Sequence, residues 1–144
     1  DVIVGFPGET QDDFDETYAR CKEARFASIH VFPYSVRPGT SAAKFEDKID
    51  PISISSRMEQ LLELSKTQSY DFRQKMIGTT RQVLWEGEEG GKNSDRNWQG
   101  LTDNYVRVKT VTSANLFNQV TLAKLDRLEG ELVYSTIPVS RESY

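Results

Sequence analysis

The alternation of apolar and polar residues divides the chain into two parts with different periods. In the first part, residues 2–4 form a β-branched run that predicts a buried strand, and residues 11–25 place apolar side chains at the spacings of a helix. A second strand is predicted near residues 28–32. It is followed by a long helix over residues 51–78, which starts at an Asp-Pro pair and stops at a glycine. Residues 1–77 thus predict two successive β/α units.

Beyond residue 78 the pattern changes to the alternation that is typical of strands. Short strands are predicted near residues 83–85, 105–109, 119–122 and 130–134. Residues 87–97 are polar and predict a loop. Several short strands joined by turns with Gly and Asn favour a small barrel or sandwich, so we expect a first domain over residues 1–77 and an all-β domain over residues 78–144.

Composition and charge exclude several classes of protein. Apolar residues make up 37% of the chain and charged residues 28%, which is typical of a folded domain. The net charge is −4, and residues 76–144 carry 8 Lys and Arg against 9 Asp and Glu, so RNA binding there would depend on a local patch. No membrane span or signal peptide is visible, and we expect a cytoplasmic protein. The start inside an apolar run, without Met, suggests a piece of a longer protein.

The chain has one cysteine, Cys21, and one histidine, His30. They are too few for an internal disulfide, or for a zinc or iron–sulfur site built by this chain alone. Cys21 lies on the apolar face of the first predicted helix and predicts a buried side chain. His30 lies in the second predicted strand, where it either contacts a substrate or has a structural role. No catalytic or metal-binding residue is predicted in this chain.

The segment that most favours ligand binding is the turn after the first strand, residues 4–9. Ligands of parallel α/β folds gather at the carboxyl ends of the strands, and glycines there allow the backbone to approach a ligand closely. The candidate residues are Val4, Gly5, Phe6, Pro7, Gly8 and Glu9. A tight strand-to-helix turn without a ligand is an equal alternative.

The loop after the second strand is expected on the same side of the sheet, because both strands are parallel. Its candidate residues are Phe32, Pro33, Tyr34, Ser35, Arg37 and Thr40. Tyr34 is suited to stacking on a base, and Arg37 to holding a carboxylate or phosphate. The alternative is an ordinary surface loop.

The all-β part combines aromatic and cationic residues, as proteins that bind single-stranded RNA do. The residues concerned are Trp98, Tyr105, Arg107 and Lys109. The alternative is that Trp98 and Tyr105 belong to the core and that the cations are simply solvated.

Three segments in order resemble the radical S-adenosylmethionine (SAM) methylthiotransferases. Residues 1–10 (DVIVGFPGET) resemble a late-barrel segment of radical SAM enzymes, and residues 30–40 (HVFPYSVRPGT) resemble the branch that acts on N6-threonylcarbamoyladenosine in tRNA. Residues 72–78, with residues 100–106 (GLTDNYV) beyond them, resemble the junction into a TRAM domain, a small β-barrel associated with RNA binding. The resemblance covers nearly the whole chain.

The resemblance implies the end of a TIM-type radical SAM barrel followed by a small antiparallel, OB-like TRAM barrel. The full enzyme would use SAM and [4Fe–4S] clusters to methylthiolate C2 of an adenosine beside the tRNA anticodon. Residues 4–9 and 32–35 would then line the SAM site, and Arg37 and Thr40 would lie nearer the substrate. The implied RNA-binding residues are Trp98, Asn104, Tyr105 and Arg107. The cluster motif is absent, so we expect this chain alone to be inactive.

Alternatives remain open at this point. The related branch that modifies a ribosomal protein would use the β domain to hold protein, and a non-catalytic RNA- or protein-binding module belongs to another class. A radical SAM enzyme of porphyrin metabolism would lack the TRAM-like part. The implied partner is the tRNA anticodon stem-loop, with no membrane partner. The incomplete barrel also exposes the edge of the first strand, which predicts pairing with a second copy of the chain.

Overall fold

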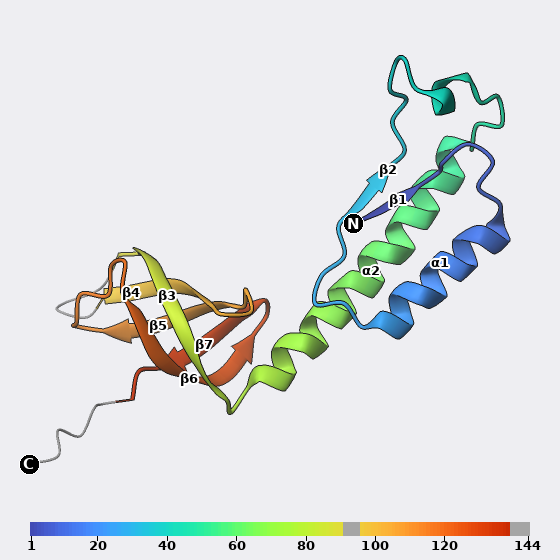
Figure 1. Cartoon of the computed structure of the whole chain (residues 1–144). Helices are drawn as coiled ribbons and strands as arrows, with labels where there is room; N and C mark the ends of the chain where they lie inside the picture. Colours follow the sequence, from blue (N-terminus) through green and yellow to red (C-terminus); the bar gives the residue numbers. More distant parts are fainter. Residues whose placement is uncertain (91–95, 139–144) are drawn as a thin grey trace, which may run out of the picture. The chain divides into compact units, whose positions relative to one another are not determined.

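The computed structural model describes residues 1–90 and 96–138, which form two compact units (Figure 1). We call residues 1–72 the α/β unit and residues 73–144 the barrel unit. Among the described residues, no helix is long and apolar enough to cross a membrane.

The α/β unit contains a parallel pair of strands and two long helices. Its elements are β1 (Val2–Val4), α1 (Gln11–Ala24), β2 (Val31–Pro33), the short 3₁₀ helix η1 (Ser41–Lys44) and α2 (Pro51–Met76), which runs past residue 72. Strand β1 pairs with β2 in parallel, with Ile3 opposite Phe32. The order strand, helix, strand, helix agrees with the predicted β/α units. The described residues supply two strands of this sheet, so a TIM-type barrel is not seen in them.

Local signals in the sequence explain where the helices begin and end. Thr10 and Asp13 form the predicted capping box at the start of α1. Helix α1 ends where Arg25 adopts a left-handed conformation, with a φ of 50°. Asp50 caps α2 by accepting a hydrogen bond from the amide of Ser53 at 2.9 Å.

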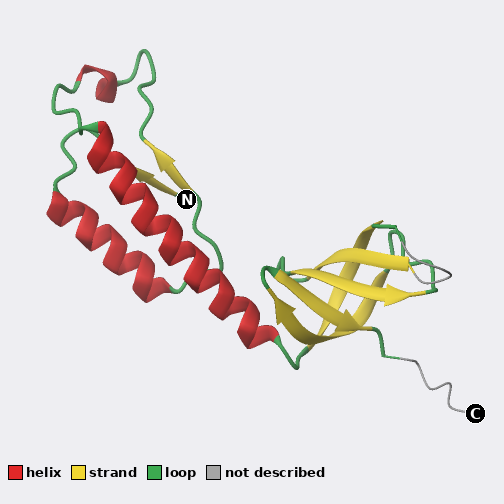
Figure 2. Ribbon diagram, turned by 180° about the vertical axis from the view of Figure 1, so that it is seen from behind, coloured by secondary structure: helices red, strands yellow, loops and turns green. Residues whose placement is uncertain are grey.

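The helices cover one face of the small sheet (Figures 1 and 2). The core residues of this unit are Val4, Phe14, Cys21, Ile29, Leu61 and Leu64. Phe14 and Cys21 are buried as the helical spacing predicted. On α2, Leu61 and Leu64 are buried, whereas Leu62 is half-exposed. Ile3 and Phe32 are register partners, and both are half-exposed. The helices cover the face of the two-stranded sheet that carries Val4, so Ile3 and Phe32 lie on the opposite face.

The barrel unit is a closed sheet of five strands (Figure 2). The strands are β3 (Thr80–Glu88), β4 (Arg96–Thr102), β5 (Arg107–Thr112), β6 (Val120–Glu129) and β7 (Leu132–Thr136). They follow the order β3-β4-β5-β7-β6 around the barrel, and β6 returns to β3.

The prediction of an antiparallel barrel was wrong in one respect. Strands β5 and β7 pair in parallel, whereas the other four pairs are antiparallel. The reason is geometric: strand direction alternates around an antiparallel barrel, so an odd number of strands leaves one parallel pair. The barrel is therefore mixed.

Strand β4 was missed by the sequence analysis, which assigned part of it to a polar loop. Its outward positions carry Asn97 and Gln99, which hide the alternation, while Trp98 and Gly100 point into the core. Gly100 marks a close approach of two strands, because a Cβ atom there would lie 2.5 Å from the carbonyl oxygen of Leu84. Residues 91–95 of the predicted loop lie outside the described residues.

Candidate functional site

The turn that joins β1 to α1 is built on two glycines with left-handed backbone. Gly5 has a φ of 77° and Gly8 a φ of 86°, which other residues adopt only with strain. A Cβ atom at Gly5 would lie 2.6 Å from Cγ1 of Ile54 on α2, so this residue must also be small. At Gly8 a Cβ atom would meet nothing within 4 Å, so space remains beside the backbone there.

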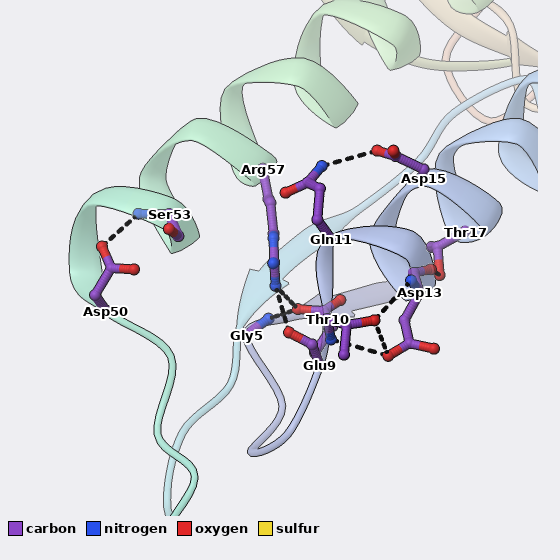
Figure 3. Close-up of polar contacts among 10 residues, drawn as sticks. All are labelled: Gly5, Glu9, Thr10, Gln11, Asp13, Asp15, Thr17, Asp50, Ser53 and Arg57. Carbon is purple, nitrogen blue, oxygen red and sulfur yellow. Dashed lines mark hydrogen bonds and ion pairs between the residues drawn. The ribbon is translucent and has the colours of Figure 1, made fainter.

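The turn is fixed by a buried ion pair between Glu9 and Arg57 of α2 (Figure 3). Glu9 Oε2 accepts one hydrogen bond from the Gly5 amide and another from Arg57 Nη1, each at 2.6 Å. Arg57 Nη1 also donates to the Glu9 carbonyl at 3.2 Å. Only 12% of the Glu9 side chain and 7% of the Arg57 side chain are exposed. The Arg57 guanidinium carbon lies 5.5 Å from the centre of the Phe14 ring, a cation–π distance.

Arg57 was not among the residues predicted from the sequence. It lies 48 positions after Glu9 and on a helix that reads as an ordinary amphipathic segment. The one feature of the sequence that points to Arg57 is its position, because it is a cationic residue on the helix face that otherwise carries Leu61 and Leu64. An arginine on an apolar face indicates a buried acidic partner, because an unpaired buried charge is costly.

The loop after β2 lies beside this turn, as the parallel strands predicted. The Tyr34 amide donates to the Val4 carbonyl at 2.8 Å, and the Gly8 amide donates to the Asp47 carbonyl at 2.8 Å. Three aromatic rings gather there, because the Phe6 ring packs edge-on against Tyr34 at 5.1 Å and Phe45 at 6.1 Å. The carboxyl ends of β1 and β2 thus meet in one aromatic, glycine-containing surface.

A small hollow of about 150 Å³ opens between the turn, the loop and α2. Gly5, Pro7, Tyr34, Phe45 and Ile54 are among its lining residues. Pockets that enclose a whole cofactor are larger, about 300–1,000 Å³. This hollow is therefore too small to enclose a whole cofactor by itself.

The predicted site residues differ in how they are placed in this surface. Phe6 and Tyr34 face it, and Pro33 and Ser35 are exposed beside it. Val4 is fully buried among the core residues, and the Glu9 carboxylate is bound to Arg57. Both residues therefore support the turn from behind and are unsuited to touching a ligand with their side chains.

Arg37 and Thr40 are both exposed and are joined to each other. The Thr40 hydroxyl donates to the Arg37 carbonyl at 2.8 Å, and it accepts from the Ala43 amide to cap η1. The Arg37 guanidinium forms no ion pair within the described residues, so its charge is available to a ligand in solution.

The described residues do not fit an iron–sulfur cluster. They contain no group of three or more His, Cys, Asp or Glu side chains that could hold a metal ion. Cys21 is buried, and desolvation raises the pKa of its thiol, which disfavours the thiolate that a cluster requires. His30 is exposed and lies just before β2, with Nδ1 3.0 Å from an Asp1 carboxylate oxygen.

A larger hollow in the α/β unit does not coincide with the predicted site. It measures about 780 Å³ and lies along α1 and the start of β1, with Val2, Thr17, Cys21 and Phe26 among its lining residues. Its lining includes the charged residues Asp13, Glu16 and Arg20 of α1, and it does not include the glycine turn over residues 5–9. We do not assign it to ligand binding.

In the barrel unit, Trp98 cannot serve as the RNA-stacking residue that the sequence suggested. Its side chain is 2% exposed, and its Nε1 donates to the Ala114 carbonyl at 3.0 Å inside the unit. Trp85 is likewise buried and donates to Thr121 Oγ1 at 2.8 Å. The alternative reading of Trp98 as a core residue is therefore correct.

The other barrel candidates lie on the surface. Tyr105 is 86% exposed and has a φ of 63° in the turn before β5. Asn104 beside it accepts a hydrogen bond from Thr102 Oγ1 at 2.6 Å, which shapes this turn. Arg107 and Lys109 point outward from β5 and pair with Glu86 and Glu89.

Comparison with known proteins finds relatives that match most of the length of this chain. No family model matches the chain. The threonylcarbamoyladenosine tRNA methylthiotransferase MtaB of Bacillus subtilis is 34% identical over 125 residues, which are 87% of this chain and 28% of that protein. The tRNA-2-methylthio-N(6)-dimethylallyladenosine synthase of Clavibacter michiganensis is 42% identical over 95 residues, 66% of this chain and 18% of that protein.

The corresponding synthase of Corynebacterium diphtheriae is 44% identical over 93 residues, which are 65% of this chain and 18% of that protein. The chain thus spans less than a third of the length of these relatives. The resemblance that the motifs indicated is confirmed: the chain is related in sequence to the tRNA methylthiotransferases.

Proposed function

We propose that the chain is the C-terminal part of a radical SAM enzyme that methylthiolates an adenosine beside the tRNA anticodon. The observation that carries this proposal is the similarity to MtaB, which extends over 87% of the chain. We place the substrate at C2 of N6-threonylcarbamoyladenosine, following the name of that relative and the loop over residues 30–40. The protein would act in the cytoplasm, where tRNA is found.

In this proposal residues 1–77 complete a β/α barrel, and the glycine turn forms one wall of the SAM site. SAM, when bound, would supply both a radical and the transferred methyl group. The backbone of Gly5 and Gly8 would approach the cofactor closely, and the rings of Phe6 and Tyr34 are suited to packing on its adenine. Glu9 and Arg57 would hold the turn in its bound shape, and Arg37 would lie toward the substrate.

The iron–sulfur chemistry would belong to parts of the protein other than this chain. The described residues hold no metal-binding group, and the chain has a single cysteine. We therefore propose that the chain has no catalytic activity when it is isolated.

Residues 78–144 would act as the TRAM domain that holds the tRNA anticodon stem-loop. The surface position of Tyr105, Arg107 and Lys109 supports such a role, since an exposed aromatic ring and nearby cations suit RNA. Asn104 would act indirectly by shaping the turn that carries Tyr105.

A second candidate substrate is N6-dimethylallyladenosine. The synthases named for this modification are 42–44% identical to the chain, higher than the 34% of MtaB, although over fewer residues. The chemistry at C2 would be the same in the two cases, and the group on N6 would differ.

The two substrates are distinguished by mass spectrometry of tRNA nucleosides from cells with and without the gene that encodes the chain. Loss of 2-methylthio-N6-threonylcarbamoyladenosine, with the unmethylthiolated nucleoside accumulating, would support the first candidate. Loss of the dimethylallyl derivative would support the second. Unchanged levels of both nucleosides would contradict the proposed function.

The edge of β1 bears on the predicted pairing with a second copy of the chain. Within the described residues β1 pairs with β2 alone. We propose that the isolated chain can dimerise by adding a second β1 strand at this edge. Sedimentation of the 144-residue chain should then show a dimer, whereas a monomer at high concentration would exclude this pairing.

A further inference from the structure

We propose that the outer face of β5, β7 and β6 binds single-stranded RNA, with Tyr134 as the stacking residue between Lys109 and Arg127. This inference rests on the proposed function and gives it a location on the barrel. Neither Tyr134 nor Arg127 was among the residues expected from the sequence.

The strand register places these three residues in one row across the sheet. Lys109 on β5 is the register partner of Tyr134 on β7, and Tyr134 is the register partner of Arg127 on β6. Directly opposed side chains on one face are near neighbours. Val133 and Ser135, on either side of Tyr134, are buried, so Tyr134 itself faces outward.

A β-bulge turns Arg127 toward this face. The pairing of β6 with β7 shifts register between Leu125 and Arg127. Without the shift, Arg127 would point inward like Leu125, which is fully buried. With it, the Arg127 guanidinium carbon lies over the Tyr134 ring, 4.3 Å from its centre. The ring is thus held in place by a cation–π contact.

A hydrogen bond joins two of the strands that carry the row. The Ser135 hydroxyl donates to the Lys109 carbonyl at 3.1 Å, which ties β7 to β5 beside the parallel pair. A fixed aromatic ring flanked by cations matches single-stranded RNA, because bases stack on the ring or on the guanidinium plane while phosphates meet the charges. Trp98, by contrast, is buried and cannot do this.

The charges of the row are available because their present partners are solvent-exposed. Arg127 Nε lies 2.6 Å from Glu129, and Lys109 pairs with Glu89, whose side chain is more than half exposed. The Arg127–Glu129 pair is exposed on both sides, and such pairs are weak and yield readily to a phosphate. The Lys109 side chain is less accessible, with 23% of it exposed. Lys124 on β6, the register partner of Thr136, adds a further exposed cation near this row, two positions along β7 from Tyr134.

The test is binding of the 144-residue chain to a fluorescently labelled tRNA anticodon stem-loop, measured by anisotropy at increasing salt. We expect Tyr134→Val to weaken binding about 5- to 100-fold, as loss of one stacked base does, while Tyr134→Phe binds like the unsubstituted chain. Circular dichroism melts of both variants establish that the barrel remains folded.

The salt dependence of binding distinguishes a cation that contacts phosphate from a residue that only supports the fold. Arg127→Gln should make the slope of log affinity against log salt shallower by about 0.7 for the lost phosphate contact, whereas Tyr134→Val should leave the slope unchanged. Glu129→Gln should strengthen binding, because it releases Arg127.

Tyr105→Ala removes the exposed tyrosine of the turn before β5, the other place where we propose RNA contacts, so it compares the two locations. Loss of binding in Tyr105→Ala but not in Tyr134→Val would overturn the inference and place the RNA at the turn before β5. No binding by the unsubstituted chain at low salt would also overturn it. The tRNA nucleoside analysis reports separately on the proposed function in either case.

Discussion

Arg57 Nη1 on α2 lies 2.6 Å from Glu9 Oε2, and the same oxygen accepts the Gly5 amide at 2.6 Å. One carboxylate thus joins both ends of the glycine turn to the long helix. The turn cannot move independently of α2 while this contact lasts. A turn that must present its backbone to a cofactor benefits from being held in shape before the cofactor arrives.

Removing the arginine should be strongly destabilising. Arg57→Leu leaves the Glu9 carboxylate buried without its cation, which typically costs about 3–5 kcal/mol of unfolding free energy. Urea denaturation followed by circular dichroism measures this loss. The double variant Glu9→Gln/Arg57→Leu should recover part of it, because no buried charge then remains unpaired.

An exposed arginine provides the control for this comparison. Arg20 pairs with Glu16 and Glu23 on the surface of α1, and about three quarters of its side chain is exposed. Arg20→Leu should change the unfolding free energy by less than about 1 kcal/mol. Equal losses in Arg57→Leu and Arg20→Leu would contradict the role given to the buried pair.

Gly5→Ala should lower the free energy of unfolding for two separate reasons. The left-handed φ of 77° costs a residue with a Cβ atom about 1–2 kcal/mol, and the new atom would also clash with Ile54 at 2.6 Å. Gly39→Ala, with a φ of 86° and open space around the added atom, carries only the first cost. Denaturation of the two variants should therefore show the larger loss at Gly5. Similar losses would mean that Ile54 moves aside easily.

The helix caps predict how stability depends on acid pH. Hydrogen bonds from the Thr10 side chain and amide lower the pKa of Asp13, and those from Ser53 lower the pKa of Asp50. A carboxylate with a lowered folded pKa stabilises the fold above its unfolded pKa of about 3.9. This contribution is lost as the pH falls through the lower folded pKa.

Thermal melts between pH 7 and pH 2 test this expectation. At pH values below about 4, the melting temperature of the unsubstituted chain should decrease. Asp13→Asn should make this decrease smaller, because it removes the titrating carboxylate of the capping box. Asp12→Asn on the same helical turn removes a carboxylate outside the capping box and should change the pH profile less. The same profile in Asp13→Asn as in the unsubstituted chain would contradict the capping argument.

The sequence was informative where local chemistry decides the structure. The capping box of Thr10 and Asp13, the Asp50 cap and the glycine turn all depend on residues a few positions apart. The alternating strands beyond residue 78 likewise predicted an all-β part. Strand β4 was missed because its outer positions are polar and Gly100 interrupts the pattern, so that only the partner strands reveal it.

The sequence was less informative where distant segments meet. The pairing of Glu9 with Arg57 spans 48 positions, and no local pattern specifies it. The outward position of Arg127 depends on a bulge that appears only when β6 is paired with β7. The position of Trp98 was undecided for a similar reason, because an aromatic residue suits both a core and an RNA surface until the strand's inner face is known.

The most direct test of the central claim is complementation in cells. A strain that lacks the full-length gene whose product contains this chain would receive that gene unsubstituted or with Glu9→Gln. The 2-methylthioadenosine derivatives in tRNA are then quantified by mass spectrometry and the protein levels by immunoblot. We predict that the unsubstituted gene restores the modification and that Glu9→Gln, at an equal protein level, lowers it at least about tenfold, as loss of a charged hydrogen-bond acceptor does. Full restoration by the variant, or no methylthiolated adenosine even with the unsubstituted gene, would contradict the account.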